Sequence, residues 1–235
     1  MAFGAQSMAF LKGLKKHNNR PWFEAHKADY EFHLKEPMKE LIEEMDVRLA
    51  RIAPEITGDP KRSMFRIYRD IRFSKDKSPY KTHVACWFFH RDGRHNVGQE
   101  SEGGGAGYYF HLQPGECFTG GGLWMPPKPS LDKLRDAIVN DFGKFKKAAL
   151  SPVMKKRFGG LDDENKLKRV PRGYDPEHPA GEWLKFQSFI VGRKVPDRVA
   201  TSGKLAKFLE DDFKAMLPLV RWINGVLGLQ AASRR

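Results

Sequence analysis

The chain has 235 residues, of which 40% are hydrophobic and 12% aromatic, a composition that fits one well-filled core and excludes a disordered chain. Its 42 Lys and Arg residues outnumber 29 Asp and Glu residues, so the net charge is +13. Such a charge attracts nucleic acids, phosphorylated metabolites and anionic membrane surfaces, and it does not choose among them.

No membrane insertion is expected, because no apolar run approaches the ~20 residues that a membrane helix needs. The start, MAFGAQSMAFLKGLKKHNN, lacks the regions of a signal peptide, so we expect a cytoplasmic protein. Cys86 and Cys117 are spaced neither as a zinc knuckle nor as a redox pair, and we interpret them as buried thiols.

The first predicted elements are helices. Ser7 is placed to cap a short amphipathic helix, which leaves residues 1–7 as a loose extension. Asn19 is placed to cap a second helical stretch, whose apolar residues recur at helical spacing as far as Ile52. Pro37 divides this stretch into two helices or one kinked helix.

The next stretch, from Arg62 to Lys81, holds seven cations and two anions, a local balance of 7 − 2 = +5. Aromatic and β-branched residues run between the charges, so this is not a solvated tail. The pattern fits either a helix or a strand. We favour a strand over about 63–69, because a turn-rich loop and the strand formers of 82–90 follow it. Arg69 then points into the core.

A β-hairpin is predicted over 106–123. The segments AGYYFHLQ and ECFTGGGLW alternate as strands, and Pro114-Gly115 make the turn. A two-residue loop pairs His111 with Phe118. The run of three glycines in the second strand marks a bulge or a place where something approaches the backbone closely.

The rest of the chain is predicted to be mainly helical, from about Ser130, through the basic segment 144–158, to a last helix that begins near Ser202. We therefore expect an α+β fold in one domain spanning 1–235. Its central, mostly antiparallel sheet has about four strands, covered by helices from both ends of the chain. The expected strands are 63–69, 82–90, 106–113 and 116–123.

The most specific motif is R-x-x-R-D-x-R-F-x-x-D-K-x-x-Y, from Arg66 to Tyr80. Three further segments stand out: FLKGLKKHNNRPWFEAHKADY, AGYYFHLQPGECFTGGGLWMPP and LKRVPRGYDPEHPA. Together these motifs resemble the uncharacterised bacterial family catalogued as domain of unknown function 2461, and the resemblance covers nearly the whole chain. It implies no specific activity, because the family has no established biochemical function.

The chemistry that the residues themselves indicate is anion binding. The sequence shows no P-loop, no paired-His zinc helix and no nucleophile elbow, so it identifies no metal site, no cofactor and no enzyme class. Arginine offers a planar fork of donors that suits phosphate or carboxylate. We expect the arginines of the motif to bind an anionic small molecule and its aspartates to orient them. The candidate ligand-binding residues are Arg66, Arg69, Asp70, Arg72, Asp76, Lys77, Tyr80 and Lys81.

Three interpretations stay open. The first is an anion pocket in a ligand-binding module or enzyme, which other motif residues would help to line. The second is a nucleic-acid-binding protein that uses the net charge and stacks bases on aromatic side chains. The third is an Arg/Asp network that only holds the fold. Salt dependence separates the first two, since binding to a phosphate backbone weakens steeply with added salt. The candidate pocket-lining residues are His111, Gly121, Gly122, Trp124, Arg172 and His178.

Overall fold

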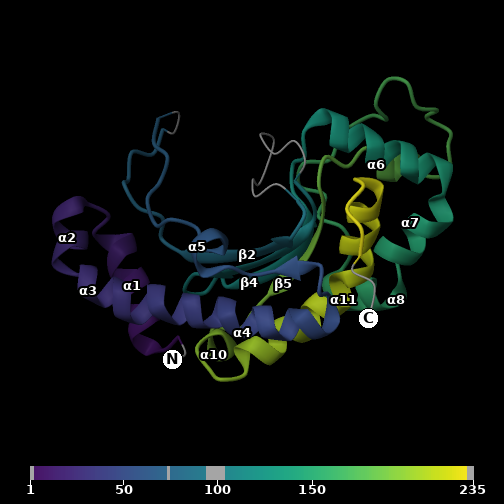
Figure 1. Ribbon diagram of the computed structural model, residues 1–235. Helices are drawn as coiled ribbons and strands as arrows, with labels where there is room; N and C mark the ends of the chain where they lie inside the picture. The colour runs from purple at the N-terminus through teal and green to yellow at the C-terminus, as the bar shows by residue number, and fades with distance from the viewer. Residues whose placement is uncertain (1–2, 73–74, 94–103, 232–235) are drawn as a thin grey trace.

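The computed structural model describes residues 3–72, 75–93 and 104–231, and it has the α+β architecture expected from the sequence (Figure 1). Its sheet is antiparallel with five strands in the order β1-β2-β3-β4-β5, one more than the four expected. The strands are β1 (Ile56–Thr57), β2 (Val84–His90), β3 (Gly107–Leu112), β4 (Phe118–Leu123) and β5 (Phe189–Lys194).

Helices make up most of the remaining structure, and none in the described ranges is long and apolar enough to span a membrane. Before β2 come α1 (Ala5–Lys16), α2 (Arg20–Ala25), α3 (Lys27–Tyr30), the π-helix η1 (Glu31–Lys35), α4 (Glu36–Ile52) and α5 (Pro60–Ser63). After β4 come α6 (Lys128–Asn140), α7 (Phe142–Ala149), α8 (Pro152–Phe158), α9 (Gly181–Leu184), α10 (Asp197–Ala200) and α11 (Leu205–Val226). Pro37 lies near the start of α4, which continues η1 in helical conformation, and the His33 carbonyl four residues before it accepts a hydrogen bond from Ser7 Oγ at 2.7 Å.

The two long helices α4 and α11 cover one face of the sheet (Figure 1), as expected for helices from the two ends of the chain. Phe213 of α11 stacks on Tyr108 of β3, with ring centroids 4.3 Å apart. A Cβ atom at Gly121 would lie 2.8 Å from Met216 Sδ, so this glycine lets α11 approach β4. Burial of one large apolar side chain such as Phe213 contributes roughly 1.5–3 kcal/mol.

The predicted hairpin is confirmed. His111 pairs with Phe118, and the Glu116 N–H donates to the Gln113 carbonyl at 2.9 Å across the turn. The glycine run had two explanations, a bulge or a group that approaches the backbone closely. At Gly122 the structure shows a close approach. Its φ is 126°, and a Cβ atom there would lie 2.0 Å from the Phe189 carbonyl oxygen of β5. The approaching group is therefore the neighbouring strand.

The predicted strand over 63–69 is wrong. The described residues 64–72 and 75–83 form an irregular hairpin, which we call the arm. It joins β2 through a single bridge from Met64 to Cys86 and closes on itself through a single bridge from Tyr68 to Tyr80. Ile67 and Tyr80 are buried, but among the described residues of the arm the pairing does not extend beyond these bridges into a strand. Arg69 is only half-buried, so it does not point into the core.

Two further features differ from the expected fold. The fifth strand, β5, lies before the last helix, in a segment where no strand was expected. Residues 3–7 are not a loose extension, because Phe3 and Ser7 are buried. The N-cap of α1 is Gly4, whose N–H donates to Ser7 Oγ at 3.0 Å, and Ser7 Oγ donates to the His33 carbonyl at 2.7 Å.

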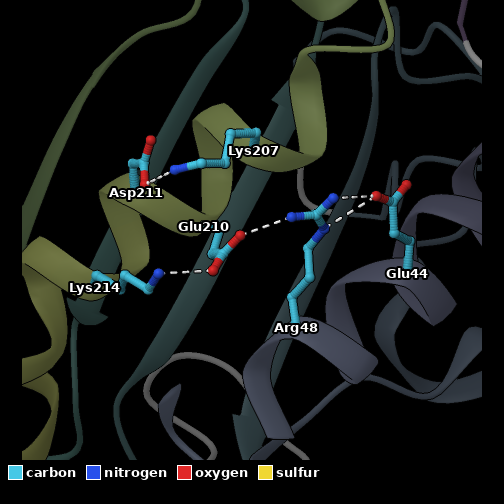
Figure 2. A network of polar contacts seen from close by, with 6 residues as sticks. All are labelled: Glu44, Arg48, Lys207, Glu210, Asp211 and Lys214. Carbon is cyan, nitrogen blue, oxygen red and sulfur yellow. Dashed lines mark hydrogen bonds and ion pairs between the residues drawn. The ribbon is translucent and has the colours of Figure 1, made fainter. Parts of the chain in front are cut away.

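Charged side chains join α4 to α11, as Figure 2 shows. Arg48 on α4 donates from Nη1 to Glu210 on α11 at 2.7 Å and from Nη2 to Glu44 at 2.7 Å. Glu210 also pairs with Lys214 at 2.7 Å, and Lys207 pairs with Asp211 one turn earlier. Of these pairs, Arg48–Glu210 links the two helices, while the others lie within α4 or α11.

A second, buried ion pair ties α11 to two other elements. Asp212 of α11 is 0% exposed and accepts hydrogen bonds from Arg157 Nε of α8 at 2.6 Å and Arg193 Nε of β5 at 2.8 Å. The carboxylate is therefore satisfied from both sides, as a buried charge must be.

Candidate functional site

The face of the sheet that α4 and α11 leave uncovered carries a continuous group of aromatic side chains. Cross-strand partners share a face, so Trp87, Tyr109 and Gly120 point to the same side. In Figure 1 the arm and the segment around α6 rise on this side at the two ends of the sheet. We call this surface the open face and define it by Trp87, Phe89, Tyr109, His111, Phe118, Gly120, Gly122 and Gly192.

The aromatic rings of the open face form a row that continues onto the arm. Phe65 of the arm lies 5.9 Å from Tyr109, and Tyr109 lies 5.4 Å from Phe118, between ring centroids. Phe118 in turn stacks on His111 at 4.7 Å and is 38% exposed. Such a group of partly exposed rings on a sheet is typical of a binding surface.

The β4 and β5 part of the open face is nearly free of side chains. Gly120 pairs with Gly192, and Gly122 pairs with Ile190. The strands themselves require these two paired glycines, because a Cβ atom at Gly120 would lie 3.0 Å from the Val191 carbonyl and one at Gly192 would lie 2.9 Å from the Thr119 carbonyl. The consequence is bare backbone beside the aromatic row.

Two histidines lie together where the arm meets the sheet. The rings of His83 and His111 are 4.1 Å apart between centroids. Burial and the neighbouring His111 lower the pKa of His83 to about 4, and burial also lowers the pKa of His111. Gln113 Oε1 lies 3.1 Å from His111 Nε2, which assigns the proton to Nε2 and lets Nδ1 accept from the Tyr109 hydroxyl at 3.2 Å. Both rings are therefore neutral at pH 7.

Three cations border the aromatic row. Arg62 Cζ lies 5.3 Å from the ring centroid of Phe89, and Lys81 Nζ lies 5.5 Å from that of Phe65. Burial lowers the pKa of Lys81, and the charge of Arg66 adds to this effect. In the part of the chain that the structure describes, Arg62, Arg66 and Lys81 form no ion pair with a carboxylate. These cations thus add positive charge to the open face, although the charge of Arg66 also helps to lower the pKa of Asp70. No cluster of three His, Cys, Asp or Glu side chains suited to a metal occurs among the same residues.

The other arginines of the motif are paired within the arm. Arg72, which is 76% exposed, donates from Nη2 to Asp70 Oδ2 at 2.7 Å and from Nε to Asp70 Oδ1 at 3.0 Å. This fork lowers the pKa of Asp70 to about 2. Arg69 pairs with Asp76.

Asp76 organises the turn at the end of the arm. It accepts from Ser78 Oγ at 2.6 Å and from the Ser78 N–H at 2.9 Å. These bonds, together with the Arg69 pair, lower the pKa of Asp76 to about 2. Lys77 Nζ donates to the Ile71 carbonyl at 2.9 Å. Asp70 and Asp76 therefore position Arg72 and Arg69. Each of these arginines already has a carboxylate partner.

Tyr80 attaches the arm to the N-terminal helices. Its ring is 1% exposed and stacks on Phe23 of α2, with centroids 4.1 Å apart. Its backbone N–H donates to Asn18 Oδ1 at 3.1 Å, and its carbonyl accepts from Asn18 Nδ2 at 2.9 Å. This geometry places Tyr80 in the core beneath the arm.

The candidate pocket-lining residues are spread over the molecule. His111 and Gly122 lie on the open face, whereas Gly121 faces α11. Trp124, 52% exposed, directly follows β4. Arg172 and His178 belong to the segment before α9, which is held beside α6 by the hydrogen bond from the Tyr174 hydroxyl to Asp136 at 2.8 Å. The Ala180 N–H donates to His178 Nδ1 at 3.1 Å, which makes this histidine part of a turn.

Sequence reasoning did not include several residues of the site: Arg62, Phe65, His83, Trp87, Phe89, Tyr109, Phe118 and Gly192. Alternation along β3 could have found Tyr109, because it alternates with residues of the buried face. β2 carries apolar residues on both faces, so its pattern could not assign Trp87 to either one.

The comparisons with known proteins give a family. A family model described as a conserved hypothetical protein (DUF2461) matches residues 6–222, a range that contains the arm and all five strands. No curated protein and no solved structure matches the chain.

Proposed function

This chain belongs to the DUF2461 family of conserved hypothetical proteins, and we propose that it is a ligand-binding protein that takes up an anionic molecule on its open face. The observation that supports this proposal is the charge of Arg62, Arg66 and Lys81, which form no ion pair with a described carboxylate, beside a row of partly exposed aromatic rings. The ligand carries a phosphate or carboxylate together with a flat or apolar part.

The chemistry of the face suits both parts of such a ligand. Arginine forks donate in parallel to phosphate or carboxylate oxygens, and a charge-assisted hydrogen bond contributes about 1.5–3 kcal/mol. An anion beside Lys81 compensates the desolvation that lowers the pKa of this lysine. The rings of Tyr109 and Phe118 offer contact area to a planar group.

The motif then has two roles. Arg66 and Lys81 contact the ligand, while the Arg72–Asp70 and Arg69–Asp76 pairs keep the arm in shape beside the sheet. We place the protein in the cytoplasm as part of this proposal, since both cysteines are buried free thiols.

Calorimetric titration with pyrophosphate, citrate and adenosine monophosphate tests the proposal. We expect at least one of them to bind, and we expect Arg66→Ala and Lys81→Ala each to weaken its binding about tenfold, or ~1.4 kcal/mol. Lys146→Ala removes an exposed charge from α7 and serves as the matched control, with unchanged affinity. The proposal fails when none of the three compounds binds, or when the control loses as much affinity as the arm variants.

A further inference from the structure

We propose that the ligand of the open face is a single-stranded nucleic acid, whose bases stack on the aromatic row and whose phosphates contact the cations of the arm. This inference rests on the proposed function and names its ligand class. Four observations carry it: the extent of the aromatic row, the openness of the surface, the position of the cations and the net charge of the chain.

The aromatic row is longer than a small anion needs. It runs from Phe65 on the arm across Tyr109 on β3 to Phe118 on β4, and neighbouring rings lie 5.9 and 5.4 Å apart. Trp87 adds a partly exposed ring on β2, 4.9 Å from Phe89, whose own ring is only 2% exposed. Every base has a flat face that stacks on such rings whatever its sequence. A row across several strands therefore contacts several successive bases.

The surface is broad, because its rings extend from the arm over β2, β3 and β4. Cavities of about 220 and 150 Å³ lie elsewhere, beside α1, α4 and α10, on the helical side of the sheet. The glycines of β4 and β5 leave bare backbone beside the rings, and this provides room for a chain to pass. An extended polymer fits this shape better than a compact metabolite.

The cations lie where the phosphates of a stacked strand would be. Arg62 and Lys81 contact rings at the arm side of the row, and Arg66 lies close enough to Lys81 to lower its pKa. The net charge of +13 attracts a polyanion from a distance. A single strand is favoured over a duplex, because paired and stacked bases cannot lie on aromatic side chains.

Fluorescence anisotropy with labelled twelve-nucleotide oligomers of thymidylate and uridylate, at low salt, tests this inference on the full chain. We expect a single strand to bind at least tenfold more tightly than a blunt duplex of the same length. We expect Phe118→Ala to weaken the binding about fivefold or more, since it removes one stacking platform.

A matched pair of double variants separates the open face from the general charge of the protein. Arg66→Ala with Lys81→Ala, and Lys146→Ala with Lys147→Ala, each remove two positive charges, and only the first pair lies on the arm. We expect the arm pair to weaken binding and to reduce its salt dependence, while the α7 pair binds as the parent does. Circular dichroism confirms that each variant is folded, and the exposed Arg66→Ala single variant replaces any that is not.

Three results overturn the inference. The first is an oligomer that binds no more tightly than adenosine monophosphate, which leaves the proposed function standing. The second is no binding of the oligomers, of pyrophosphate, of citrate or of adenosine monophosphate, which removes both proposals. The third is a dimer in light scattering that Phe118→Ala dissociates, since a second copy of the chain then covers the face.

Discussion

His83 and His111 show how single residues set the charge of the open face. Each ring is largely removed from water, and the positive charges of Lys81 and Arg69 repel the protonated form of His83. Both effects oppose protonation, so the pair contributes hydrogen-bonding groups and no charge at pH 7. The positive charge of the face therefore comes from its arginines and its lysine and not from its histidines.

A pH dependence of stability follows from His83. Its pKa is about 4 in the folded protein and about 6.5 in an unfolded chain, so the unfolded state takes up the proton first. The stability that the neutral ring provides is fully present above pH 6.5 and is lost as the pH falls through 4. We expect urea unfolding to show a loss of stability over this window that His83→Asn reduces. His17→Asn, at an exposed position on the surface, is the control. An identical pH profile in His83→Asn would contradict the assignment.

At the scale of elements, α11 is the helix on which several other elements pack. It packs on β4 and α4 and also contacts α6, α7 and α8. Asp212 is the polar centre of this packing, because it binds one arginine from α8 and one from β5. A buried carboxylate with two partners keeps one of them when the other is removed.

The two arginines should therefore show strong non-additivity. We expect Arg157→Met and Arg193→Met each to cost about 1 kcal/mol or slightly more, since the other arginine still neutralises Asp212. The double variant leaves this carboxylate buried without a partner and should cost about 3–5 kcal/mol. Denaturant unfolding of the four proteins measures the coupling. Lys207→Met breaks the exposed pair with Asp211 and should change stability by less than about 0.5 kcal/mol. Additive losses would show that the arginines act independently.

At the scale of the whole molecule, one hydrophobic core runs from Phe3 to Ile223. It includes residues of the N-terminal helices, of the sheet and of α11, and β5 from late in the sequence completes the sheet beside β4. Residues from the N-terminal and C-terminal helices therefore pack into the same core.

We accordingly expect the protein to unfold in one cooperative transition. In scanning calorimetry the calorimetric and van't Hoff enthalpies should agree, and circular dichroism and tryptophan fluorescence should give the same midpoint. Two resolved transitions, or midpoints that differ between the probes, would show that the 235 residues form more than one folding unit.

The sequence by itself determined the features that depend on neighbours along the chain. Alternation and the Pro114-Gly115 turn predicted the hairpin and its pairing of His111 with Phe118. Helical spacing predicted that α4 and α11 are amphipathic and cover the sheet. The motif from Arg66 to Tyr80 indicated where cations gather, because charge density can be counted directly from the residues.

Only the tertiary structure decided which of these residues meet. Whether an arginine is available to a ligand depends on carboxylates brought near it by folding, and Asp70 and Asp76 occupy Arg72 and Arg69 while Arg66 stays without a described carboxylate partner. The strand β2 is apolar on both sides, so its register with β3, and not its pattern, placed Trp87 on the open face. Register and distance are properties of the packed chain, since they arise from contacts between segments far apart in the sequence.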